Sequence, residues 1–333
     1  MTLRVAHLDP SLRARIVWRR PLHYRAGPDA SLDRPAHLRA GSSIAWIGDR
    51  LAVVQDDANF IALVDPETGL AEAITLPAGE LGLRQFDDAR GNKKFKLDLE
   101  SCFVVAGPAG PQLVALGSGT KKRRRRVVTV DRWHDAEPRV SVIDATALYL
   151  ALDAAVAFSG SDMNIEGALA LGESVRLFGR GNGTPAGGYV PLNATCDLRL
   201  NDLLDYLASP DDSPPPGPES ITQFELGTLD GLVLGFTDAA VFGTAVLYTA
   251  AAEASGTASD DGAVTGSVIG VLPDAGALRY ARLTDASGLP TRDKVEGLVA
   301  VPGSADRALV VIDPDDPARP SELCEVSLTG DWA

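Results

Sequence analysis

Short apolar runs separated by turn residues follow one another along the whole chain. Residues 51–54, 113–116, 175–178 and 308–312 are examples, and Gly, Pro, Asp and Ser stand between such runs. This punctuation is typical of short β-strands joined by turns, whereas a doubly wound sheet needs a long helix after most of its strands. The pattern therefore predicts an all-β fold.

Five segments open in the same way and indicate an internal repeat. In the three clear members, residues 98–105, 164–171 and 294–301, an apolar residue precedes Glu, and Gly or Ser then leads into an apolar run. Two weaker members have Ser43 and Thr237 in the place of the Glu. The repeat length is about the 40–70 residues that one propeller blade and its loops require.

Repeats of that length predict one domain, residues 1–333, folded as a five-bladed β-propeller. We place the blades at approximately residues 40–80, 96–153, 162–230, 232–285 and 292–330. The last blade is one strand short, and residues 15–22, within the segment 13–24, can supply that strand beside residues 323–328. The pairing would close the ring and hide both sheet edges. Residues 254–262 are expected to form a hairpin tip.

The repeat places one residue of each blade at the axis, because the innermost strand of each blade lines the central channel. The residues at the repeated position are Ser43, Glu100, Glu166, Thr237 and Glu296. Three facing carboxylates without a partner would repel one another, and some would retain protons. A hard cation such as Ca²⁺, with its oxygen ligands, would remove the repulsion. In the alternative interpretation, the glutamates accept backbone hydrogen bonds from neighbouring blades and lock the ring.

The order Ser, Glu, Glu, Thr, Glu at successive inner strands resembles the calcium-activated apyrase family of nucleoside-diphosphate hydrolases. The basic and aromatic residues 94–96 before Glu100 add to the likeness. The resemblance implies that the five axial residues hold calcium, although the longer catalytic motifs of that family are missing. The openings are also similar to those of phytase-like esterase propellers, and we expect a separate bacterial branch of such propellers.

The loops that follow the second strand of each blade should surround the mouth of the channel. Asp56 and Asp57 in one such loop, together with Asp98, are candidate general bases for an attacking water. Arg180 and Asn182 are candidate ligands for the charge that develops on a substrate. One hypothesis is a metal-dependent hydrolase of a phosphorylated or ester substrate that binds at the axial mouth. The other is a non-enzymatic propeller with a structural cation, whose face binds a protein or a small ligand.

Composition limits the partners and the compartment. With 31 basic and 45 acidic residues and a net charge of −14, binding to nucleic acid or to acidic membranes is disfavoured. The cationic run at residues 121–126 is expected to pair with Asp residues or lie at a solvated tip rather than grip phosphate. The sequence shows no membrane span and no secretory signal. Three widely separated cysteines predict free thiols and a cytoplasmic location.

Overall fold

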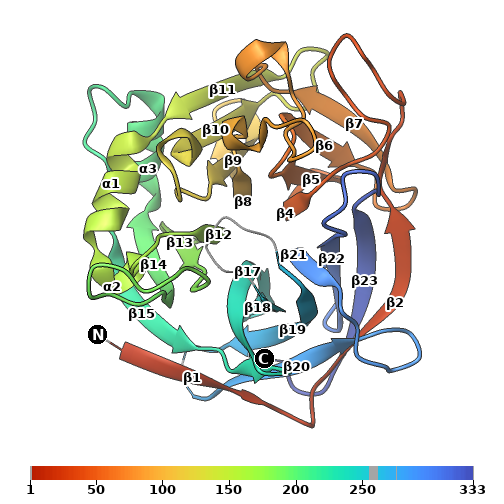
Figure 1. Ribbon diagram of the computed structural model, residues 1–333, viewed down its shortest axis with the longest axis vertical. Coiled ribbons are helices and arrows are strands. Elements are labelled where there is room, and N and C mark those ends of the chain that lie inside the picture. The colour runs from red at the N-terminus through yellow and green to blue at the C-terminus, as the bar shows by residue number, and fades with distance from the viewer. Residues whose placement is uncertain (1, 255–261, 275, 333) are drawn as a thin grey trace.

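The computed structural model describes residues 2–254, 262–274 and 276–332, and these residues form a β-propeller (Figure 1). The all-β prediction is confirmed. Twenty of the described strands form five antiparallel sheets of four strands each. The predicted hairpin tip at residues 254–262 lies almost wholly outside the described residues.

The strands of the first three sheets, from the axis outward, have the following bounds. The first sheet contains β4 (Gly41–Ile47), β5 (Arg50–Gln55), β6 (Phe60–Val64) and β7 (Leu70–Thr75). The second contains β8 (Leu99–Gly107), β9 (Gly110–Gly117), β10 (Arg126–Asp131) and β11 (Arg139–Asp144). The third contains β12 (Ile165–Leu171), β13 (Ser174–Gly179), β14 (Asn193–Arg199) and β15 (Glu219–Glu225).

The fourth sheet contains β17 (Leu232–Phe242), β18 (Ala245–Glu253), β19 (Val264–Leu272) and β20 (Leu278–Thr284). The fifth contains β21 (Lys294–Ala300), β22 (Arg307–Asp313), β23 (Glu322–Thr329) and β2 (Arg13–Pro21). The remaining elements are β1 (Thr2–Leu8), β3 (His23–Tyr24), β16 (Thr228–Leu229), α1 (Thr146–Ala154), α2 (Val156–Ser159), α3 (Leu200–Ala208) and 3₁₀ turns at Glu80–Gly82, Lys93–Phe95 and Lys122–Arg124.

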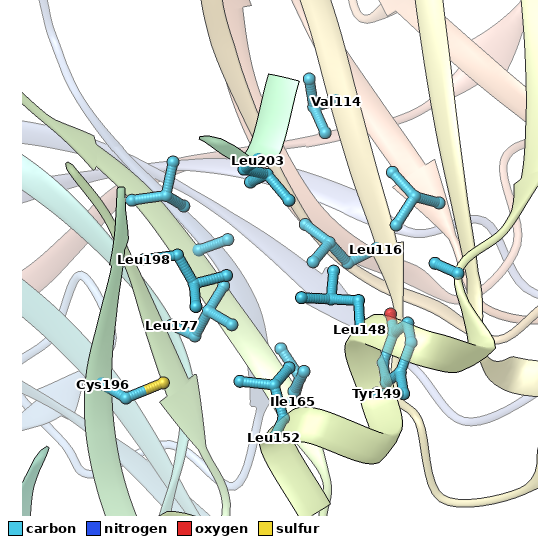
Figure 2. Packing of buried hydrophobic residues seen from close by; sticks show 14 of the residues in the cluster. Val114, Leu116, Leu148, Tyr149, Leu152, Ile165, Leu177, Cys196, Leu198 and Leu203 are labelled. Atoms are coloured by element: carbon cyan, nitrogen blue, oxygen red, sulfur yellow. The ribbon is translucent and has the colours of Figure 1, made fainter. Parts of the chain in front are cut away.

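The middle strands are apolar on both faces because each sheet packs between two others. β6 is buried at every position, and so is β18 up to its last residue. In the described part of the chain, five clusters of buried apolar side chains each fill one junction between neighbouring sheets. Figure 2 shows the cluster between the second and third sheets, where Leu148, Tyr149 and Leu152 of α1 pack toward β9 and β13. Burial of this kind supplies most of the favourable free energy of folding.

The N-terminal strand closes the ring, as the sequence predicts. β2 pairs antiparallel with β23, with Ala14 opposite Leu328 and Ile16 opposite Val326. The first strand, β1, was not predicted. It runs parallel to β15 over residues 2–5 and parallel to β20 over residues 6–8, so it links the outer edges of the third and fourth sheets.

Two further observations concern the helices and the cysteines. No helix among the described residues is long and apolar enough to cross a membrane. Cys102, Cys196 and Cys324 are all buried and free, as expected from their spacing.

Candidate functional site

A β-bulge in each inner strand builds a ring of side chains around the axis. In each of the five inner strands, one residue has no partner in the ladder to the second strand. These bulge residues are Ser42, Glu100, Glu166, Thr237 and Glu296. A bulge bends its strand and redirects the side chain of the extra residue. The repeated Glu of the sequence therefore marks a repeated backbone irregularity.

Two members of the predicted ring need correction. Ser42, not Ser43, is the bulge residue of β4, and it lines the axial cavity. The error of one position arose because two serines are adjacent and Gly41 stands where the other repeats have an apolar residue. Thr237 is a bulge residue, but its hydroxyl donates a hydrogen bond to Thr249 Oγ1 at 2.9 Å, and Thr237 does not line the cavity.

The axial cavity has a volume of about 40 Å³, which has room for a metal ion or a few water molecules but not for an organic substrate. Its described lining is almost entirely polar. Seven carboxylates face it: Asp56, Asp98, Glu100, Glu166, Glu253, Glu296 and Asp313. Four basic side chains face it: Lys96, Arg124, Arg180 and Lys294. Acidic groups therefore outnumber basic ones.

One side of the cavity is built around Asp98. Carboxylate oxygens of Asp56, Asp98 and Glu100 lie within 4.8 Å of one another. The Lys96 ammonium is 2.5 Å from Asp56 Oδ2 and 2.7 Å from Asp98 Oδ1, and Arg124 Nη1 is 2.9 Å from Asp98 Oδ2. Asp98 has a φ of 60°, in the left-handed region that non-glycine residues rarely adopt. The structure thus brings together two predicted bases and one predicted ligand.

The other side of the cavity holds Glu166 and Glu296, and each has a basic partner. Arg180 lies 3.4 Å from Glu166 Oε1 and 2.6 Å from Glu253 Oε2. Lys294 lies 3.0 Å from Glu296 Oε1. The premise that the axial glutamates have no partner is therefore wrong for Glu166 and Glu296. Glu296 Oε2, however, is buried and accepts no hydrogen bond from any described residue.

Burial and the neighbouring basic groups give the carboxyl groups of the cavity different pKa values. Burial raises the pKa of Glu166 to about 8, with Glu296 adding to the shift against the opposing Arg180. Burial likewise raises the pKa of Glu100 and of Glu296 above the ordinary range. Burial also opposes ionisation of Asp98, yet Lys96 and Arg124 outweigh it and hold the pKa of that carboxyl below its ordinary value. Asp98 is therefore an anion while Glu166 keeps its proton near neutral pH.

Three other predicted site residues lie apart from the cavity centre or are already paired. Asp57 pairs with Arg39 and lines an adjoining pocket of about 170 Å³ instead of the axial cavity. Arg180, predicted to bind substrate, is only 4% exposed and is engaged by Glu166 and Glu253. Asn182 is half-buried at the rim, where its Oδ1 accepts a hydrogen bond from Asn164 at 3.2 Å.

The cationic run at residues 121–126 pairs with acidic residues, as the sequence predicts. Arg123 pairs with Glu80, Arg125 with Asp153 and Arg126 with Asp144. Arg124 differs from these three because its partner, Asp98, lines the axial cavity. The run therefore contributes one side chain to the axial cavity.

A buried carboxyl group that the sequence did not single out, that of Asp238, connects several inner strands. Asp238 Oδ2 accepts hydrogen bonds from Ser43 Oγ at 3.1 Å and from Leu298 N at 3.0 Å, and Oδ1 accepts one from Ala239 N at 2.8 Å. Ser43 Oγ in turn accepts a hydrogen bond from Cys102 N. These bonds tie β17 to β21, β4 and β8. The role of locking the ring, considered for the glutamates, is thus filled by Asp238.

A cleft of about 290 Å³ adjoins the axial cavity and shares Lys294 and Asp313 with it. Arg292 and Arg319 line this cleft, and both are exposed. Neither arginine forms an ion pair with another residue in the described part of the chain. The sequence analysis missed this pair because nothing in the repeat connects residues 292 and 319.

Comparison with known proteins gives one family and distant likenesses. Residues 37–328 match the family described as "Family of unknown function (DUF6929)". No curated protein matches. Among solved structures, the chain is similar to the glutaminyl cyclase of Myxococcus xanthus, with 10% identity, a TM-score of 0.44 and 99% of both chains covered.

Two further solved structures are similar at the same low level. The α-L-arabinofuranosidase PaAbf62A from Podospora anserina has 12% identity and a TM-score of 0.44 over 98% of this chain and 99% of that one. The Cps50 (Swd1) β-propeller domain from Myceliophteria thermophila has 12% identity and a TM-score of 0.34 over 85% of this chain and 67% of that one. Likenesses of this degree carry no inference about activity.

Proposed function

We propose that this chain, which belongs to the DUF6929 family of unknown function, is a cation-binding propeller that hydrolyses a small anionic ester. The observation that carries the proposal is the excess of carboxylates over basic groups in the buried axial cavity. An unbalanced buried negative charge is costly unless a proton or a cation neutralises it. The raised pKa of Glu166, Glu100 and Glu296 expresses that cost.

The donor set of the cavity suits calcium. Asp56, Asp98 and Glu100 offer carboxylate oxygens within 4.8 Å of one another, and oxygen is the donor that Ca²⁺ prefers. The unpartnered Glu296 Oε2 supports the same proposal, because a buried carboxylate oxygen rarely lacks a partner. Calcium bound there would polarise a substrate oxygen or a water molecule.

The protein's own carboxylates supply an acid and a base. Asp98, which Lys96 and Arg124 keep ionised, is the group able to accept a proton from water. Glu166, with a pKa raised to about 8 by burial, is the group able to donate one near neutral pH. Hydrolases commonly use two carboxyl groups whose environments separate their pKa values in this way.

The cleft beside the cavity supports an anionic substrate. The cavity itself is too small for an organic molecule, so the substrate must lie in an adjoining space. The exposed Arg292 and Arg319 can donate forked hydrogen bonds to a phosphate or carboxylate group in that cleft. Lys294 lines both spaces, so it would lie between an anion bound in the cleft and the axial carboxylates.

Calcium should raise the melting temperature of the protein. At a concentration about 100-fold above Kd, binding to the folded state alone adds about 2.7 kcal/mol. Glu100→Gln should remove most of this gain while the cation-free protein stays folded, because the change is nearly isosteric and removes one excess charge. Glu219→Gln, at an exposed site on β15, is the matched control and should respond to calcium like the wild type. Identical melting curves in calcium and in EDTA would refute the cation site.

The double variant Arg292→Gln, Arg319→Gln should raise KM for an anionic ester by at least about ten-fold, because each charge-assisted hydrogen bond is worth roughly 1.5–3 kcal/mol. The kcat should stay close to that of the wild type, and KM for a neutral carboxyl ester should not change. Steady-state assays of phosphate and carboxyl esters and nucleoside diphosphates, in calcium and in EDTA, measure this. Calcium binding without turnover of any of them would instead favour the non-enzymatic propeller with a structural cation.

A further inference from the structure

Lys96 stands in the position that a metal ion at the three carboxylates would take. Its ammonium lies 2.5 Å from Asp56 Oδ2 and 2.7 Å from Asp98 Oδ1, and it also attracts Glu100 electrostatically. The side chain is 7% exposed, so water contributes little to its solvation. An ammonium and a calcium ion cannot both lie at contact distance from the same carboxylate oxygens without strong repulsion.

The ammonium has a second place to go. Lys96 lines the axial cavity and also the adjoining pocket of about 170 Å³. That pocket is also lined by Asp57 and Asp87, which share Arg39 as their basic partner, and by Asp88, which pairs with Lys93. Asp57 Oδ1 is buried there and accepts no hydrogen bond from a described residue. Rotation about the side-chain bonds of Lys96 would move its ammonium away from Asp56 and Asp98 and toward the carboxylates of this pocket.

We propose that Lys96 is a tethered counter-ion that a divalent cation must displace from Asp56 and Asp98, and that it thereby selects divalent over monovalent cations. The proposal rests on the cation site of the proposed function. A monovalent ion only replaces one positive charge by another, so it gains nothing against a tethered ammonium. A divalent ion brings twice the charge to the same oxygens and can exceed the ammonium in Coulomb energy.

The competition has a thermodynamic consequence. The binding-competent form, with the Lys96 ammonium in the adjoining pocket, is only a fraction of the cation-free protein. The apparent affinity for a divalent cation is reduced by that fraction. Removing the ammonium should therefore strengthen calcium binding. The gain should exceed that from removing a basic group that only repels the ion from a distance.

Calorimetric titration of calcium into the wild type, Lys96→Met and Lys94→Met tests the proposal. Methionine keeps the length and the apolar stem of the side chain and removes its charge. Lys96→Met should bind calcium at least ten-fold more tightly, and potassium should compete with calcium in this variant but not in the wild type. Lys94→Met is the matched control, because Lys94 is exposed on the same segment and lines neither the axial cavity nor the adjoining pocket. It should bind calcium like the wild type.

A measurement on the wild type covers the case in which Lys96→Met does not fold. Reductive methylation followed by mass spectrometry should modify Lys96 faster in calcium than in EDTA, because displacement brings its amine into the more open pocket. Equal calcium affinity in wild type and Lys96→Met, or equal methylation in both conditions, would overturn the displacement of Lys96 and leave the cation site standing. Failure of both proteins to bind any divalent cation would overturn the proposed function as well.

Discussion

Replacing Asp238 with alanine should lower the free energy of unfolding by about 3–6 kcal/mol, the largest effect we expect from a single substitution. The variant leaves three buried donors without an acceptor: Ser43 Oγ, Leu298 N and Ala239 N. Each unsatisfied buried donor costs about 1–3 kcal/mol. Water cannot easily replace the carboxylate, because Asp238 is 1% exposed.

Urea unfolding of three variants checks this expectation. Asp238→Asn should fall between wild type and alanine, because its amide retains one oxygen acceptor but turns an N–H toward another donor. Glu219→Ala, which removes a surface ion pair with Arg199, should change the free energy of unfolding by less than about 1 kcal/mol. A loss at Asp238→Ala no larger than that at Glu219→Ala would contradict the assignment of Asp238 as the lock of the ring.

The cation-free protein should lose stability as the pH rises from 5 to 9. Burial raises the pKa of Glu166 from 4.5 to about 8, so the folded state keeps a proton that the unfolded state releases. Its stabilising contribution is complete below pH 4.5 and is lost as the pH passes through about 8. One pKa unit corresponds to about 1.4 kcal/mol, so this group alone contributes on the order of 5 kcal/mol. Glu100 and Glu296 shift in the same direction.

Urea unfolding at pH 5, 7 and 9, in EDTA and in calcium, measures this loss. Calcium should flatten the pH dependence of stability, because the bound ion neutralises the axial carboxylates in place of the protons that it displaces. Glu166→Gln should flatten the dependence even in EDTA. Asp98, whose pKa is lowered, affects stability only in more acidic solution and leaves this window unchanged. A cation-free protein that becomes more stable between pH 5 and 9 would contradict the excess of buried carboxylates.

Local patterns in the sequence were sufficient for the architecture. Strand length, turn residues and the repeated openings each depend on neighbours within a few positions, so they can be read without knowing the fold. The same reasoning placed Glu100, Glu166 and Glu296 at the axis and β2 beside β23. It failed by one residue at Ser43, because a β-bulge is a backbone feature that alternation alone does not reveal.

Partners that are distant in sequence were beyond such reasoning. Arg180 meets Glu253 across 73 positions, and Ser43 meets Asp238 across 195. The cations that balance the axial glutamates are partly local, and Lys294, two residues before Glu296, could have been found by strand alternation. The contact of Lys96 with Asp98, two residues on, could have been found in the same way, but its contact with Asp56 spans 40 positions and could not.

The pairing of β2 with β23 also bears on how the protein is made. Residues 13–21 leave the ribosome long before residues 322–329, so β2 waits for its antiparallel partner β23 while most of the chain is made. Its buried positions, such as Ala14 and Ile16, alternate with arginines that include Arg13 and Arg15. Charges of this kind discourage a waiting strand from pairing with another chain. The ring is therefore completed only once residues 322–329 have left the ribosome, and this seam is where a nascent propeller stays open longest.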